Sequence, residues 1–357
     1  LYADVDGRLV RREGDELDVT AERTSVDTCG VPEVALVLVN DDDRTYAKVR
    51  LDDRSTDAVA RGLSTIDAAV ARAVVWAALW DATRDGELPV ARYVEIVTRH
   101  APAEPNVALL ADAIADAGHA IAHYAPVDAR ADLSRQWLDV AWTALIEAPA
   151  GSDAQLAWAR GIGAAAAYAD DRAASIRALL DGAESAPAGL RLDPELRWSW
   201  LAALSASGHA SLADADAELA RDATSHGRTA HRTVLAARPD ASVRAAAWEA
   251  AWADETLTND HLAATIAGVR AGGRRDLVAR FDETYFARLR VVWAERCIEI
   301  ARRIVVGLFP ASDSLDLVDA WLADNEDAPG ALRRLIIEQR DGLARDLRVR
   351  AAQPSAL

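Results

Sequence analysis

The sequence contains no methionine, two cysteines, three phenylalanines and a single lysine, Lys48, among its 40 basic residues. Two cysteines are too few for a disulfide-rich secreted scaffold, and we expect no bridge between Cys29 and Cys297 because they fall in different predicted modules. A chain without methionine, even at position 1, is predicted to be part of a longer polypeptide. No signal-peptide pattern is visible, and a reducing compartment fits, so we predict a cytoplasmic location.

Long apolar runs are also missing. The longest candidate, residues 68–79, is interrupted by Arg72 and falls short of the roughly 20 residues that a membrane span needs. The formal net charge is −17, and no basic stripe offsets it, which argues against a nucleic-acid partner. We therefore expect neither a membrane nor a nucleic acid among the partners.

What the sequence does contain is Ala and Leu in abundance, within a hydrophobic fraction of 51% and a charged fraction of 27%. These proportions are those of an ordinary folded chain, and Ala and Leu favour helices. Only residues 1–52 have a β-like pattern, with a compact apolar run at 34–39 followed by a polar turn at 40–43. We predict a small β-sandwich there, possibly truncated at its N-terminal edge.

Residues 53–357 have helical periodicity throughout, broken by Gly and Pro at short intervals. Ser152, Asp240 and Ser312 are predicted to cap helix N-termini. Two successive helices take about 35–45 residues, the period of paired-helix repeats. The predicted fold is therefore mostly α: a HEAT/armadillo-like α-solenoid bowl preceded by the β-module, with the eleven tryptophans as wedges in its core.

The strongest candidate for metal chemistry is the pair His119 and His123, four residues apart on a predicted helix. Catalytic zinc helices carry Glu directly after the first His, but here that position is Ala120, and no third ligand is evident. The acidic turn 40–43 lacks the alternating spacing and closing Glu of a calcium loop. No nucleophile motif such as Gly-x-Ser-x-Gly occurs. From the residues alone we predict no metal ligand, no cofactor and no catalytic residue.

Six segments, in order, resemble the C-terminal region of actinobacterial aminopeptidase N, a relative of the endoplasmic-reticulum aminopeptidases, and the resemblance spans essentially the whole chain. The segment 36–55 is similar to the exit from that family's β-sandwich, and the other five to successive helical pieces. The six segments are 36–55, 72–88, 148–160, 190–210, 236–252 and 293–310.

This resemblance implies a substrate-enclosing helical domain of a zinc aminopeptidase that removes N-terminal residues from peptides. Its partners would be the catalytic domain of the same polypeptide and the peptide substrate. The family's His-Glu-x-x-His and Gly-x-Met-Glu-Asn motifs are absent here, the second necessarily so in a chain without Met. The zinc and the catalytic residues are therefore expected upstream of Leu1, and the chain alone is expected to be inactive.

The resemblance also implies one substrate-binding residue. Bacterial members place an Arg from the helical domain toward the active site, in a context that resembles the segment 294–299, which makes Arg296 the candidate here. The alternative is a simple ion pair between Arg296 and Glu299, three residues later. The alternative function for the whole chain is a free-standing HEAT-like scaffold that binds a protein or peptide.

Overall fold

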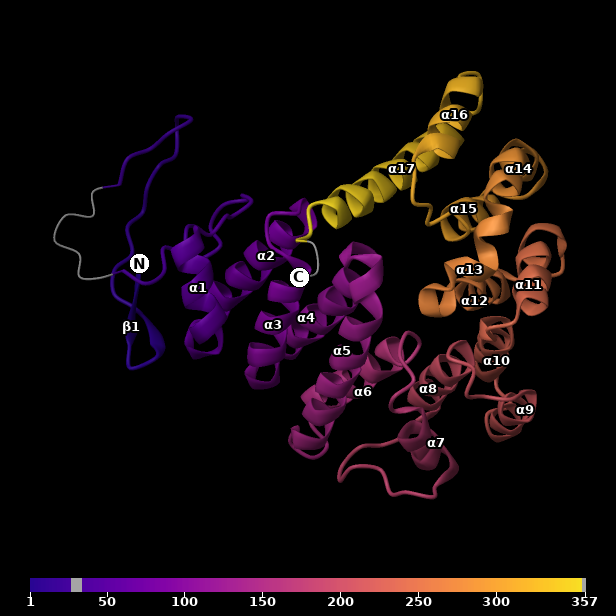
Figure 1. Ribbon diagram of the computed structural model, residues 1–357, viewed down its shortest axis with the longest axis horizontal. Coiled ribbons are helices and arrows are strands. Elements are labelled where there is room, and N and C mark those ends of the chain that lie inside the picture. Colours follow the sequence, from indigo (N-terminus) through magenta and orange to yellow (C-terminus); the bar gives the residue numbers. More distant parts are fainter. Residues whose placement is uncertain (27–33, 355–357) are drawn as a thin grey trace. The chain divides into compact units, whose positions relative to one another are not determined.

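The computed structural model describes residues 1–26 and 34–354, and Figure 1 shows their course. The chain divides by its internal contacts into two compact units, Leu1–Ala120 and Ile121–Leu357. Both are built mostly from helices, which confirms the predicted mostly α class. Within the described residues, no helix combines the length and apolarity needed to cross a membrane.

Unit 1 begins with an antiparallel hairpin of β1 (Tyr2–Val5) and β2 (Arg8–Arg11). Asp6 and Gly7 take φ values of 52° and 80° between the strands, as in a tight two-residue hairpin turn. The strand predicted over 34–39 is reduced to one bridge between Leu36 and Tyr2, because the Val37 N–H donates to Ser55 Oγ of the first helix. A β-sandwich is not confirmed in the described part of 1–52, and Cys29 lies outside the described residues.

The helical part starts at Asp53, where the predicted change from β to α falls. Asp52 is the N-cap, and its carboxylate accepts from Ser55 N at 2.6 Å. The division between compact units comes later than residue 52 because Leu9 N of the hairpin donates to Thr65 Oγ1 at 2.8 Å, tying β2 to the end of α1. The helices of unit 1 are α1 (Asp53–Gly62), α2 (Ala69–Asp85), α3 (Val90–His100) and α4 (Val107–His119), with short 3₁₀ turns at Leu63–Thr65 and Ala101–Ala103.

A buried ion pair stabilises unit 1. Arg72 of α2 donates to both oxygens of the Glu104 carboxylate, from Nε to Oε2 and from Nη2 to Oε1, each at 3.0 Å. Its Nη1 donates to the Ile66 carbonyl at 2.8 Å. Trp76 Nε1 donates to the same carboxylate at 3.2 Å. With its charge neutralised and its oxygens bonded, Glu104 holds the loop before α4 against α2.

The division between the two units falls within a π-helical turn, η3 (Ala120–Tyr124), so that unit 2 begins at Ile121. Its helices are α5 (Val127–Glu147), α6 (Asp153–Ala165), α7 (Ala173–Asp181), α8 (Pro194–Ala206), α9 (Leu212–Arg221), α10 (Ser225–Ala237), α11 (Ala241–Ala253), α12 (Asn259–Arg270), α13 (Arg275–Val278), α14 (Asp282–Glu295), α15 (Ile298–Gly307), α16 (Asp316–Asp324) and α17 (Gly330–Ala351), with 3₁₀ turns at Ala271–Gly273 and Ala279–Phe281.

The helices of unit 2 pack in a regular order. A first row runs α6, α8, α10, α12, α15 and α17, each in contact with the next. Other helices pack against this row: α9 contacts α10, and α11 contacts both α10 and α12 (Figure 1). Two predicted N-caps are confirmed, since Ser152 accepts from Gln155 N and Asp240 from Ser242 N and Val243 N. The Ser312 prediction is wrong: α16 begins at Asp316, and Ser312 bonds within the preceding loop.

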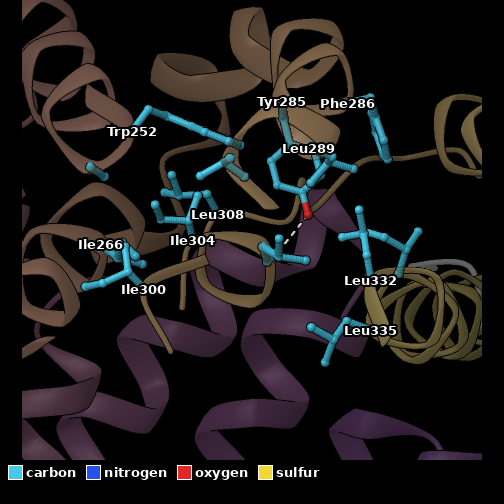
Figure 2. Close-up of a cluster of buried hydrophobic side chains, with 14 of the residues drawn as sticks. Trp252, Ile266, Tyr285, Phe286, Leu289, Ile300, Ile304, Leu308, Leu332 and Leu335 are labelled. Carbon is cyan, nitrogen blue, oxygen red and sulfur yellow. Dashed lines mark hydrogen bonds between the residues drawn. The ribbon is translucent and has the colours of Figure 1, made fainter. Parts of the chain in front are cut away.

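The tryptophans are mostly core residues, as predicted, and most of them are buried. In the second half of unit 2 they join one apolar cluster from α11 to α17, shown in part in Figure 2. Tyr285 is fully buried there and donates its hydroxyl to the Val305 carbonyl at 2.6 Å, which satisfies the only polar atom of its side chain. Burial of each large apolar side chain contributes roughly 1.5–3 kcal/mol.

Arg244 in the first turns of α11 has no exposed surface. Its guanidinium donates to carbonyls at the ends of two other helices: Ala237 and Arg238 after α10, and Gly268, Val269 and Ala271 at the end of α12. Burial, and then the charge of Arg274, lower the pKa of Arg244 to about 10, so the side chain remains charged at neutral pH. The charge is balanced by carbonyl dipoles at the negative ends of helices.

Replacement of Arg244 by Met is expected to lower the free energy of unfolding by about 3 kcal/mol or more, because several buried carbonyls lose their donor together. Urea unfolding followed by tryptophan fluorescence measures this change. The matched control is Arg302→Met on α15, where the side chain is exposed and the expected change is within about 0.5 kcal/mol. Equal unfolding midpoints for the two variants would show that Arg244 does not hold the helices together.

Candidate functional site

Arg296, the predicted substrate-binding residue, follows the end of α14. Its guanidinium donates through Nη1 to the Trp252 carbonyl at 3.0 Å and through Nη2 to the Asp254 carbonyl at 3.2 Å. Both acceptors lie at the C-terminal end of α11. The alternative partner Glu299 instead pairs with Arg303 at 2.9 Å. Arg296 therefore caps α11, a role that neither sequence interpretation anticipated.

A second arginine, Arg288 of α14, contacts the aromatic side chains of α11. Arg288 forms an ion pair with Glu249 at 2.7 Å and lies over the rings of Trp248 and Trp252, at 4.9 and 5.9 Å from their centroids. A guanidinium within about 6 Å of an indole centroid is favourably placed for a cation–π interaction. The last turns of α11 are therefore contacted by two arginines, Arg288 of α14 and Arg296 just after α14.

The two histidines that were weighed as metal ligands have separate surroundings. His119 ends α4 in unit 1, and its ring lies edge-on to Trp80 with the centroids 5.8 Å apart. His123 lies in the π-helical turn that begins unit 2, and its Nδ1 is 3.3 Å from Asp346 Oδ2. Across residues 1–26 and 34–354, no group of three or more His, Cys, Asp or Glu could hold a metal ion. The described residues therefore do not fit a zinc site.

Asp116 of α4 has a raised pKa, which the sequence interpretation missed. Burial, and then the neighbouring Asp112, raise its pKa to about 7, against the opposing charge of Arg84. The Asp116 charge also contributes, after burial, to a raised pKa for Tyr93. The sequence shows that Asp112 and Asp116 are four residues apart. It does not show how far Asp116 is buried, and burial is the main cause of its raised pKa.

Unit 2 closes on itself through its last helix. Arg350 of α17 forms an ion pair with Asp313 at 2.8 Å and donates to the His123 carbonyl at 3.4 Å, across a separation of 227 residues. Burial lowers the pKa of Arg130, at the start of α5, and the charge of Arg350 lowers it further. The Nε atoms of Arg130 and Arg350 are both buried without a hydrogen-bond acceptor. Two cations are thus close together where the ends of the unit meet.

Comparisons with known proteins place the chain in a family. The ERAP1-like C-terminal domain family matches residues 36–345. Because the match covers more than half of the chain, this chain belongs to that family. It is also 40% identical, over 355 residues, to "Aminopeptidase N" of Streptomyces lividans. The alignment covers 98% of this chain and 41% of the relative, so the chain spans less than half of that protein's length.

The Asp116 carboxyl makes the stability of unit 1 depend on pH. Its pKa is raised from 3.8 to about 7 on folding, so the folded state holds a proton that the unfolded state has released, and stability falls as pH rises from about 4 to about 7. Asp116→Asn mimics the protonated acid and is expected to be more stable than the parent at pH 8 but not at pH 4. Melting temperatures at the two values measure this difference.

The control for that experiment is Asp181→Asn, at an exposed position. Its melting temperature should follow that of the parent at both pH values. If Asp116→Asn also followed the parent at both, the buried Asp116 would not be the source of the pH dependence.

Proposed function

We propose that this chain is the non-catalytic C-terminal part of an aminopeptidase N-type zinc metallopeptidase, and that it encloses the peptide substrate beside the catalytic domain of the same polypeptide. The observation that carries the proposal is 40% identity to Aminopeptidase N across 98% of the chain. The membership in the ERAP1-like C-terminal domain family supports the same assignment. No particular feature favours the alternative of a free-standing scaffold.

An enclosing wall requires a curved stack of helix pairs, and we propose that unit 2 is a HEAT-like solenoid of this kind. The support is the continuous row from α6 to α17, with further helices packed between its members. Hydrogen bonds between residues about one repeat apart also support the solenoid. Arg296 donates to carbonyls 42 and 44 residues earlier in the chain, and Arg270 donates to the Gly307 carbonyl 37 residues later. A wall of this type would restrict access to short or unfolded peptides and exclude water during reaction.

We place the zinc in the catalytic domain of the full-length enzyme, because His119 and His123 face Trp80 and Asp346 respectively and the described residues do not form a metal site. The assignment of residues 1–52 and 53–357 as a β-sandwich remnant and the helical domain belongs to the same proposal. So does the cytoplasmic location, which rests on the scarcity of cysteine.

The chain alone is expected to hydrolyse no aminoacyl-p-nitroanilide and to retain no stoichiometric zinc after dialysis without chelator, whereas the full-length polypeptide does both. Elemental analysis and the p-nitroaniline release rate measure this difference, with circular dichroism to show that the isolated chain is helical. One zinc held per isolated chain, lost in His119→Ala or His123→Ala, would place a metal site here and contradict the proposal.

Arg296 remains the proposed substrate-binding residue of this domain. A partly shielded contact with a carboxylate or carbonyl of the peptide is worth about 1.5–3 kcal/mol. Arg296→Ala in the full-length enzyme should then lower kcat/KM by roughly 10- to 150-fold. The hydrogen bonds to the end of α11 support the structural alternative, in which only stability falls.

Arg333→Ala separates the two roles, because Arg333 also caps a helix end. It donates to the Leu322 and Asn325 carbonyls at the end of α16, at 2.8 and 2.6 Å. Both variants should lose similar stability in thermal unfolding. A loss of kcat/KM confined to Arg296→Ala supports substrate contact, and equal kinetic parameters in the two variants would leave Arg296 as a capping residue only.

A further inference from the structure

A groove of about 430 Å³ lies between α10 and α11 in unit 2. Its size falls within the range of small-ligand and short-peptide sites. The residues that line it come from three neighbouring helices and the link between the first two. They are Arg228, His231, Arg232, Leu235, Ala236, Arg238, Ser242, Val243, Ala246, Ala247, Ala250 and Thr265.

The charge of this groove has the opposite sign to that of the chain. Three arginines and one histidine line it and no Asp or Glu does, although the chain has 57 acidic residues against 40 Lys and Arg. Arg228 and Arg232 are four residues apart on α10, so they share a helix face, where like charges repel. A folded protein that retains such a pair without neutralising it has an attractive site for an anion.

The arginines of the groove are not neutralised by ion pairs. Arg228 donates to the Ala223 carbonyl at 2.9 Å and Arg238 to the Leu235 carbonyl at 3.2 Å. In the described part of the chain, no carboxylate lies within 4.0 Å of the guanidinium nitrogens of Arg228, Arg232 or Arg238. The histidine differs, since His231 Nε2 is 2.9 Å from Asp216 Oδ1.

Two carboxylates act on these arginines from further away, and both are engaged elsewhere. Asp240 interacts electrostatically with Arg238, but its Oδ1 accepts from Ser242 N and Val243 N as the cap of α11. Asp254 interacts with Arg232, but its Oδ1 accepts from Thr256 N and Thr256 Oγ1. Neither carboxylate lines the groove, so the positive face remains available to a ligand.

The floor of the groove is apolar and shallow because α11 presents alanines there. Ala246, Ala247 and Ala250 lie on one face of the helix, next to Val243. Short aliphatic groups can lie on such a floor while a terminal anion reaches the arginines at its margin. A glutamate side chain has this form, with two methylenes and a carboxylate.

We propose that the α10–α11 groove binds a short acidic peptide segment through its side-chain carboxylates. Arg228, Arg232 and Arg238 bind the carboxylates with their planar donor forks, and the alanine floor accepts the methylenes. The inference goes beyond the proposed function and does not depend on it, because the site is complete within this chain and needs neither the catalytic domain nor the zinc.

The test is isothermal titration calorimetry of the chain with the blocked peptide Ac-Glu-Glu-Glu-NH₂, whose only charges are side-chain carboxylates. We expect binding that weakens as salt is raised, since partly exposed charge contacts are screened. Arg232→Gln should weaken binding by about tenfold or more, because it removes a charge-assisted contact. Arg302→Gln, on an exposed face of α15, should leave affinity unchanged.

A second variant keeps the test decisive if Arg232→Gln is unstable. Ala246→Glu places a carboxylate inside the groove at an exposed helical position and should abolish binding while the protein stays folded. Free glutarate should bind more weakly than the peptide, and equal affinity would assign the site to small dicarboxylates instead. Absence of peptide binding, equal binding of Ac-Gln-Gln-Gln-NH₂, or unchanged affinity in Ala246→Glu would overturn the proposal.

Discussion

The packing of the middle of unit 2 depends on one buried cation. Arg244 lies on α11, but its hydrogen bonds go to the ends of α10 and α12, so a single side chain fixes three successive helices. An unpaired charge without solvent exposure costs several kcal/mol unless its surroundings supply the opposite potential. Here the helix C-termini supply it, because their last carbonyls have no partners within the helix and carry the negative end of the dipole.

The same device recurs through the chain with other arginines. Arg99 donates to Ala60 O near the end of α1, Arg197 to Leu180 O near the end of α7, and Arg333 to carbonyls at the end of α16. A guanidinium suits this position better than an ammonium, because its planar fork reaches two or more carbonyls without rearrangement. Arg238, which also lines the α10–α11 groove, follows the same pattern, since it donates to the Leu235 carbonyl in the last turn of α10.

Local signals in the sequence predicted those features of the fold that depend on residues close together in the chain, such as helices and their N-caps. The helical class and the caps Ser152 and Asp240 were predicted and are confirmed. Ser312 was predicted wrongly because a capping residue is a signal only where a helix begins, and α16 begins at Asp316 with Leu315 as its N-cap. The strand at 34–39 was overestimated because its apolar pattern gives no sign that Val37 N bonds to a helix side chain.

The candidate site was less predictable because its interactions join residues more than 40 positions apart in the sequence. Arg296 was identified through a resemblance, but its partners Trp252 and Asp254 lie 44 and 42 residues earlier and carry no local signal. The buried position of Arg244 was equally hidden, since no pattern distinguishes it from the exposed arginines of the same helices. Repeat periodicity constrains which helices touch, but not which side chains cross between them.

These contacts converge on α11. Arg244, near the start of α11, donates to carbonyls at the ends of α10 and α12. Arg296, just after α14, donates to the last carbonyls of α11, so an arginine fixes each end of this helix. The side of α11 that faces α10 presents small residues and no charge, and it is there that the groove forms. A ligand can bind to the open face of a helix fixed at both ends with little loss of conformational entropy, because it need not immobilise the helix. Arg244 and Arg296 thus fix the helix whose small-residue face forms one side of the groove.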